Sequence, residues 1–275
     1  MAGATRNFLI FASIIAFIYM IVMNILANSL PVNNLTTGDI SDMYPNLFAP
    51  AGFAFSIWGL IYLLVLFYVI YQAGIIRFKD KKVPEASAMK IRVFFIISSL
   101  ANGLWILSWH HLLIPVSLVL MGIIFYSLMK ICGELARFPM GTGEGFFMRL
   151  PFSIYFGWIS VACLANIIVL LVSTGWDAKS SSGIFATIAF LAAGVALTGF
   201  FTLRNRDFFY GLVPVWAYCW ILFRHLSPDL FASRYISIII TAGVSLIVLI
   251  GFLAFHLIKS RDIGVMTEAE DCHQQ

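Results

Sequence analysis

Eight long apolar runs, separated by short polar or charged segments, dominate this sequence. They fall at about residues 8–28, 52–73, 93–109, 112–129, 150–173, 183–203, 208–223 and 235–258. A helix needs roughly 20 apolar residues to cross the hydrocarbon core of a bilayer, and most of the runs approach that length. Charged residues make up only 11% of the 275 positions, against about 25% in a soluble domain. The sequence therefore predicts an all-α, polytopic membrane bundle of eight transmembrane helices and excludes a soluble globular domain.

Four of the runs need interpretation. The third and fourth are separated only by Trp109, His110 and His111, and a single helix of about 37 residues would overshoot the bilayer, so a tight helical hairpin is predicted. The first run is longer than the apolar centre of a cleavable signal and is interpreted as a retained span. The seventh run is the shortest and contains Pro214.

The basic residues predict how the bundle is oriented. With the N-terminus in the cytoplasm, 14 of the 17 Lys and Arg residues fall in cytoplasmic segments, and the opposite side holds only Lys179, Arg224 and Arg234. Short cytoplasmic loops carry an excess of basic residues. The distribution therefore predicts that both termini are cytoplasmic, and it accounts for the net charge of +4 without an anionic partner.

The polar connections and tail carry weaker signals. Residues 31–50 form a long, polar first outer loop, in which Asn34-Leu35-Thr36 matches the pattern of a glycosylation acceptor, a triplet that also arises often by chance. Residues 260–275 are polar and acidic and are predicted to be a disordered cytoplasmic tail.

The sequence offers little for metal binding, ion coupling or catalysis. Its four cysteines, Cys132, Cys163, Cys219 and Cys272, form no CxxC pair and no metal-ligand cluster, so free thiols and no metal site are predicted. The centres of all eight runs lack Asp, Glu, Lys and Arg, which argues against an ion carrier built on a buried carboxylate. Without a nucleophile elbow, a Gly-rich phosphate loop or paired intramembrane carboxylates, an enzyme is not expected.

Aromatic and polar residues recur at helical spacing in three of the runs. Trp58 and Tyr62 are four residues apart and share a helix face. The third run has a stripe at i, i+4, i+7 and i+11, formed by Ser98, Asn102, Trp105 and Trp109. The fifth run has a stripe at i, i+3, i+7 and i+11, formed by Tyr155, Trp158, Ala162 and Asn166.

These stripes are expected to face the interior of the bundle. An asparagine inside lipid is costly unless its amide is paired, so Asn102 and Asn166 should point inward and bring Trp105 and Trp158 with them. Aromatic rings beside a few amides would suit a flat, mostly apolar ligand. The same pattern also fits interfacial aromatic belts and plain helix packing, so the residues alone leave both interpretations open.

The three segments resemble the tryptophan-rich sensory protein and translocator protein family, also called TspO/MBR or peripheral benzodiazepine receptor. In that family the second helix carries W-x3-Y and the third carries N-x2-W, as Trp58 with Tyr62 and Asn102 with Trp105 do here. The fifth helix carries Y-x2-W-x3-A-x3-N, which is matched by Tyr155, Trp158, Ala162 and Asn166.

The resemblance covers residues 8–172, and longer relatives with extra C-terminal spans resemble the whole chain, including Trp216-Ala217-Tyr218. It implies a TspO/MBR-like five-helix unit at 1–175, three additional transmembrane helices at 176–259 and the polar tail at 260–275. The chain departs from the family at Phe53, where tryptophan is usual and the spacing to Trp58 is one residue short. It also departs at Ser98, where glutamine is usual, and at Pro151, which is not adjacent to Tyr155. These departures bear on ligand preference more than on fold.

The resemblance implies binding of a tetrapyrrole, sterol or related lipid for transport or stress signalling. A porphyrin or haem-type molecule would be one such ligand, and no other cofactor is expected. In this interpretation the aromatic residues provide apolar contact, the two asparagines orient the ligand and Ala162 leaves room for it. The candidate lining residues are Phe53, Trp58, Tyr62, Asn102, Trp105, Tyr155, Trp158, Ala162 and Asn166.

Two other kinds of function stay open on the sequence. The chain could be a secondary transporter of a small neutral solute that uses all eight helices, or a structural partner of a membrane complex in which the aromatic stripes only pack. The expected partners are membrane lipid and a hydrophobic small molecule, and nucleic acid is not expected. Small residues such as Gly194 and Gly199 could also support a homo-oligomer.

Overall fold

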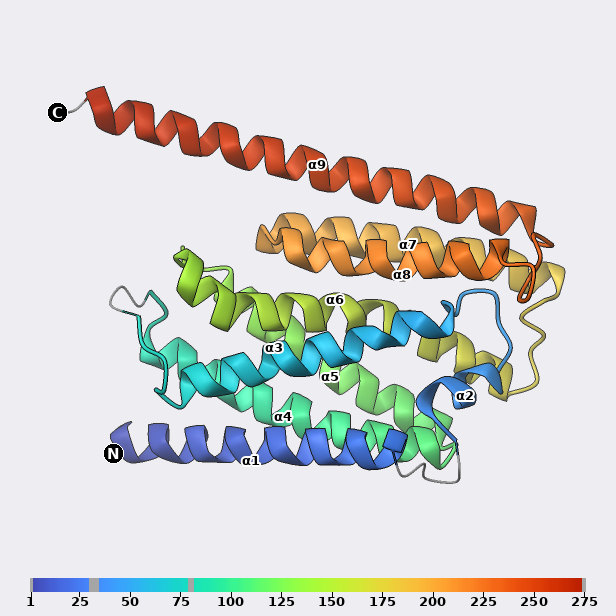
Figure 1. Ribbon diagram of the computed structural model, residues 1–275, viewed down its shortest axis with the longest axis horizontal. Coiled ribbons are helices and arrows are strands. Elements are labelled where there is room, and N and C mark those ends of the chain that lie inside the picture. Colours follow the sequence, from blue (N-terminus) through green and yellow to red (C-terminus); the bar gives the residue numbers. More distant parts are fainter. Residues whose placement is uncertain (1, 30–34, 79–81, 274–275) are drawn as a thin grey trace.

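The computed structural model describes residues 2–29, 35–78 and 82–273, and within these ranges all regular structure is helical. The long helices are α1 (Ala2–Ser29), α3 (Ile57–Gln72), α4 (Glu85–His110), α5 (Ile114–Leu135), α6 (Thr142–Ser173), α7 (Ser181–Asn205), α8 (Phe208–Leu226) and α9 (Ile236–His273). The short helices are α2 (Thr37–Asp42) and the 3-10 helix η2 (Gly52–Ser56). The long helices lie side by side along one common direction (Figure 1).

Seven helical segments in the described part of the chain are long and apolar enough to cross a membrane. The chain is therefore an integral, multi-pass membrane protein, as predicted. By length and composition this is one crossing fewer than the eight predicted, because α8 is not among the seven. Helix α8 contains Pro214 in its interior and Arg224 and His225 in its last turn.

The position of α8 nevertheless fits the predicted even number of passages. Its 19 residues give a length of about 28 Å, close to the roughly 30 Å of the hydrocarbon core. It lies alongside α7 and packs against α6, α7 and α9. As a result, the N-terminal end of α1 and the C-terminal end of α9 lie at the same end of the bundle (Figure 1).

Tight turns join neighbouring helices. The predicted hairpin between α4 and α5 is confirmed, since α4 ends at His110 and α5 begins at Ile114. Leu112 adopts a left-handed backbone conformation with φ of 57°. Between α7 and α8, Arg206 has φ of 49° and Asp207 caps α8 by accepting a hydrogen bond from the Tyr210 backbone N–H.

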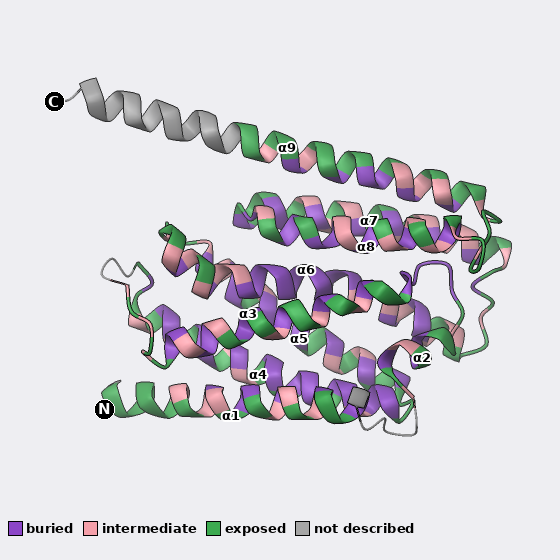
Figure 2. Cartoon of the chain, in the orientation of Figure 1, coloured by how far each residue is buried: buried purple, intermediate pink, exposed green. Residues whose placement is uncertain are grey.

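Helix α6 forms the centre of the molecule. Residues 151–161 are all buried, which Figure 2 shows as an unbroken purple stretch, and α6 packs against α3, α5 and α8. At Gly157 the backbone of α8 approaches so closely that an added Cβ would lie 2.7 Å from the Tyr210 carbonyl oxygen. Residues 151–161 of the fifth apolar run are thus covered by protein on all sides, whereas α1 and α9 expose long outer faces (Figure 2).

The structure corrects several expectations about the polar segments. The first outer loop contains a helix, α2, that hydropathy did not indicate, whereas Asn34 lies outside the described residues. The backbone of α9 continues as helix to His273, where the sequence analysis expected a disordered tail. Gly194 serves packing within the chain, since an added Cβ there would lie 2.2 Å from the Tyr218 hydroxyl oxygen.

Candidate functional site

Two adjoining hollows lie at the end of the bundle where α4 ends and α3 begins. The larger has a volume of about 420 Å³ and is lined by α1, α2, η2, α3 and α4. The smaller, of about 50 Å³, lies between the loop around residues 37–50 and helices α3, α4 and α6. Both are lined by Thr37, Phe55, Trp58 and Trp105, so these side chains form the partition between them.

The partition is a cluster of aromatic rings centred on Trp58. Its ring centroid lies 5.4 Å from Tyr62 and 6.1 Å from Trp105 in stacked arrangements, and 5.8 Å from Tyr155 and 6.4 Å from Trp158 in edge-to-face ones. Such offset and edge-to-face pairs are the favoured geometries of aromatic rings. The three sequence segments with aromatic stripes therefore meet at one place.

Trp105 has the one feature of this partition that packing does not explain. It is 4% exposed, and among the described residues its indole N–H has no hydrogen-bond partner. The neighbouring Trp109, whose ring stacks on Trp105, donates its own N–H to the Thr37 carbonyl oxygen at 3.2 Å. A buried donor without an acceptor costs about 1–3 kcal/mol, and a ligand carrying an acceptor would remove that cost.

The two asparagines face the interior, as predicted, but occupy different positions. Asn102 lies behind the partition, where its Nδ2 donates to the Tyr155 hydroxyl at 2.8 Å and its Oδ1 accepts from Asn24 Nδ2 at 2.7 Å. Asn166 lines the smaller hollow, where its Nδ2 donates to the Ala162 carbonyl oxygen and its Oδ1 accepts from the Ser117 hydroxyl at 3.4 Å. Asn102 therefore joins three helices, whereas Asn166 is placed to contact an occupant.

The remaining predicted residues also divide into those that line a hollow and those that do not. Those that line one or both hollows are Trp58, Tyr62, Trp105, Trp158, Ala162 and Asn166. Tyr155 is fully buried beside Asn102 and lines neither hollow.

Phe53 also lines neither hollow. It is 61% exposed and lies against α8, 4.8 Å from Trp220 and 6.0 Å from Trp216 between ring centroids. The cause is the 3-10 conformation of η2, whose roughly 120° rotation per residue sends Phe53 and Phe55 to different sides. Phe55, which the sequence analysis did not single out, takes the inward position and contacts Trp158 edge to face at 5.8 Å.

A comparison with known families identifies the family of this chain. A family model described as TSPO-like protein matches residues 10–255, which is most of the chain. The chain belongs to the TSPO-like family. The match runs from α1 into α9, so it includes the three helices beyond the five-helix resemblance. No curated protein and no solved structure matches the chain.

In this TSPO-like chain, the outer loop that roofs the hollows is attached to α8. The Trp216 indole N–H donates to the Ala54 carbonyl oxygen at 3.2 Å, and the Ala51 backbone N–H donates to the Trp220 carbonyl oxygen at 3.1 Å. Arg224 donates to the Pro50 carbonyl oxygen at 3.1 Å and forms an ion pair with Asp42 at 2.9 Å. A helix outside the five-helix unit thus fixes a wall of the site inside it.

The larger hollow has one carboxylate, Asp39, that is not paired with a described basic residue, since Asp42 is paired with Arg224. Asp39 and Asp42 both line it. The backbone N–H and the hydroxyl of Thr36 each donate to the Asp39 carboxylate at 2.7 Å and lower the pKa of Asp39 below its ordinary value. Asp39 is therefore ionised at neutral pH, and the mouth disfavours an anionic group.

Residues suited to metal binding do not gather within the described part of the chain. No group of three His, Cys, Asp or Glu side chains there could hold an ion. Cys132, Cys163 and Cys219 are free thiols, and the side chain of Cys272 lies outside the description.

Proposed function

We propose that this TSPO-like membrane protein binds a neutral, flat and largely apolar molecule in the two adjoining hollows, as part of its transport or sensing. The observation that carries the proposal is the unpartnered indole N–H of Trp105 in a wall of aromatic rings. The larger hollow is also in the range of roughly 300–1,000 Å³ that small-molecule sites occupy.

The lining favours one ligand class among those that the family resemblance implies. Stacked rings offer apolar contact, and Trp105 offers one hydrogen-bond donor, which suits a molecule with a single neutral acceptor. The ionised Asp39 at the mouth would repel the carboxylates of a tetrapyrrole. A sterol or a related neutral lipid is therefore the favoured ligand over a porphyrin or haem-type molecule.

The proposal concerns binding and not catalysis. The TSPO-like family is generally non-enzymatic, and the groups that line the hollows are indoles, amides, hydroxyls and two aspartates at the mouth. The proposed partners are membrane lipid and a hydrophobic small molecule.

Titration with a fluorescent sterol tests the proposal. In detergent, excitation of tryptophan should sensitise the emission of dehydroergosterol in a saturable way. Trp105→Phe keeps the ring stacking but removes the donor, so the dissociation constant should rise about tenfold, which corresponds to about 1.4 kcal/mol. Protoporphyrin, as the anionic comparison, should bind more weakly than the sterol.

Trp176→Phe is the matched control, because Trp176 does not line either hollow and its loss should leave the midpoint unchanged. The midpoint decides the test, since removing any indole lowers the signal amplitude. If neither Trp105→Phe nor Trp158→Phe shifts the midpoint, the sterol binds elsewhere and the proposed site is wrong.

A further inference from the structure

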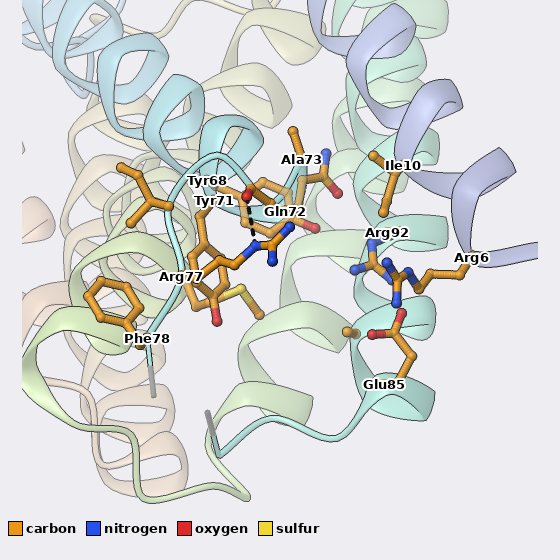
Figure 3. Close-up of a pocket in the computed structure, with 14 residues that line it drawn as sticks. Arg6, Ile10, Tyr68, Tyr71, Gln72, Ala73, Arg77, Phe78, Glu85 and Arg92 are labelled. Carbon is orange, nitrogen blue, oxygen red and sulfur yellow. Dashed lines mark hydrogen bonds and ion pairs between the residues drawn. The ribbon is translucent and has the colours of Figure 1, made fainter. Parts of the chain in front are cut away.

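A separate polar cavity of about 380 Å³ lies at the opposite end of the bundle (Figure 3). It is formed by the beginning of α1, the end of α3 with the segment that follows, the beginning of α4 and Met148 of α6. This is the end where both termini lie and where the basic residues predict the cytoplasm.

The cavity has an excess of positive charge. Arg6, Arg77 and Arg92 line it, and Glu85 is the only carboxylate among its described lining residues, so these residues carry three positive charges and one negative charge, a formal charge of +2. Arg92 forms an ion pair with Glu85 at 2.5 Å, whereas Arg6 and Arg77 form no ion pair with any residue that the structure describes. Figure 3 shows the side chains of Arg6 and Arg92 on one side of the cavity and Arg77 on the other.

Two buried side chains that line the cavity have polar atoms without hydrogen-bond partners in the described structure. Gln72 is 7% exposed, and neither its amide nitrogen nor its amide oxygen has a hydrogen-bond partner in the described structure. Arg92 is 4% exposed, and its Nε is likewise buried without a partner. Buried polar atoms in native proteins are almost always paired, so such atoms call for an explanation. Here they supply unused donors and one unused acceptor.

Membrane orientation alone does not account for these residues. A basic residue that only sets orientation needs to lie in the headgroup region, as the exposed Lys90 does on the same helix. Arg92 is instead buried, and it lines the cavity together with Gln72. Glu144, a nearby carboxylate, accepts hydrogen bonds from the Tyr71 hydroxyl and from the backbone N–H groups of Lys82 and Val83, and it does not line the cavity.

We infer that this cavity binds a phosphate group that has a hydroxyl or ammonium donor next to it. Guanidinium groups match the geometry of phosphate oxygens, and the Gln72 amide oxygen would accept from the neighbouring donor. Basic pockets between transmembrane helices on the cytoplasmic side bind lipid headgroups in this way. The phosphate can come from a phospholipid, whose chains would contact apolar lining such as Ile10 and Met148, or from a soluble phosphate ester.

Two probes with the same chemistry distinguish these sources. The full chain is prepared in phosphatidylcholine nanodiscs with a few per cent of phosphatidylglycerol, and the retained phosphatidylglycerol is counted by native mass spectrometry. Glycerol 3-phosphate, which carries the same phosphate and hydroxyl groups without acyl chains, is titrated separately by calorimetry.

The variants remove charge inside and outside the cavity in equal amount. Arg6→Gln combined with Arg77→Gln changes two exposed side chains, which keeps the buried core intact, and should weaken binding of the effective probe at least tenfold. Gln72→Met, which replaces an unpaired amide by an apolar side chain of similar length, should weaken it severalfold. Lys90→Gln combined with Arg204→Gln is the control, since both residues are exposed and neither lines the cavity. This control should change binding less than twofold.

The results distinguish a lipid headgroup site, a site for soluble phosphate esters and the absence of a phosphate site. Sensitivity of phosphatidylglycerol binding to the cavity variants, without binding of glycerol 3-phosphate, identifies a lipid headgroup site. The same variant pattern with glycerol 3-phosphate identifies a site for soluble phosphate esters. If neither probe binds, or if the control pair weakens binding as much as the cavity pair, there is no phosphate site and the basic residues act only through net charge.

Discussion

At the scale of single residues, Asn102 shows why a polar side chain can occur in the middle of an apolar run. Its amide links Asn24 of α1 and Tyr155 of α6 to α4, so all three polar groups are paired inside the membrane. Membrane interiors offer no water to replace a lost partner. The position of Asn102 therefore depends on hydrogen bonds to two other helices.

Asn102→Leu should destabilise the bundle by about 1–2 kcal/mol. The substitution leaves Asn24 without its partner on α4 and Tyr155 without the amide that contacts it, and hydrogen bonds between membrane helices are worth up to about this much. Thermal unfolding in detergent measures the change.

Ser99→Ala provides the comparison on the same helix. Ser99 is fully buried, and its hydroxyl has no hydrogen-bond partner among the described residues, so its removal should cost less than about 0.5 kcal/mol. Equal losses from the two substitutions would show that the Asn102 network contributes nothing specific.

The residue scale also shows how far the sequence predicts the site. The cost of an unpaired amide in lipid correctly predicts an inward Asn102 and Asn166, and the same argument applied to Asn24 would have found its buried amide. The argument does not separate a lining residue from one behind the wall, which is why Asn102 and Tyr155 were taken as lining. Phe53 and Phe55 could not be distinguished, because their orientation follows from the 3-10 geometry of η2 and from contacts with α8.

At the scale of elements, α8 is a short helix that holds a distant loop. Its Trp216, Trp220 and Arg224 form hydrogen bonds with residues 50–54 across more than 160 positions of sequence. Hydropathy predicts that α8 exists, but it contains no information about which loop α8 contacts. Such long-range pairing is set by packing in three dimensions, and here it makes a wall of the two hollows depend on the C-terminal helices.

Arg224→Leu should loosen the outer loop while leaving the bundle folded. The substitution removes the hydrogen bond to Pro50 and the ion pair with Asp42, so the backbone amides of Phe48 and Ala49 should exchange with deuterium about tenfold faster, as a loss of about 1.4 kcal/mol implies. Hydrogen exchange with mass spectrometry measures the rates.

Arg234→Leu serves as the control, because Arg234 is exposed on the same side of the bundle and forms no ion pair with a described residue. This substitution removes the same charge, and the amides of the outer loop should exchange with deuterium at the rate found in the original sequence. Unaltered exchange in Arg224→Leu would show that α8 does not hold the loop.

At the scale of the whole molecule, charge and helix packing agree by independent routes that both termini lie on the same side of the membrane. The excess of basic residues predicts cytoplasmic termini, and the packed helices bring both termini to one end of the bundle. The two routes agree only if α8 crosses the membrane, although its composition does not place it among the seven apolar segments. The charged residue of α8, Arg224, is paired with the Pro50 carbonyl oxygen and with Asp42, which lowers the cost of its place at the end of this helix.

The passage of α8 can be tested by labelling single cysteines on its two sides. In a chain whose native cysteines are replaced, Arg204→Cys precedes α8 and Asp229→Cys follows it, and both positions are exposed. A membrane-impermeant maleimide should label Asp229→Cys in intact cells and Arg204→Cys only after permeabilisation, with Lys179→Cys as a second outer position. Labelling of Arg204→Cys and Asp229→Cys from the same side would mean that α8 does not cross, and it would place the C-terminus opposite the N-terminus. The agreement between charge and packing would then fail at α9, because the basic residues predict that Lys259 and Arg261 at its end are cytoplasmic.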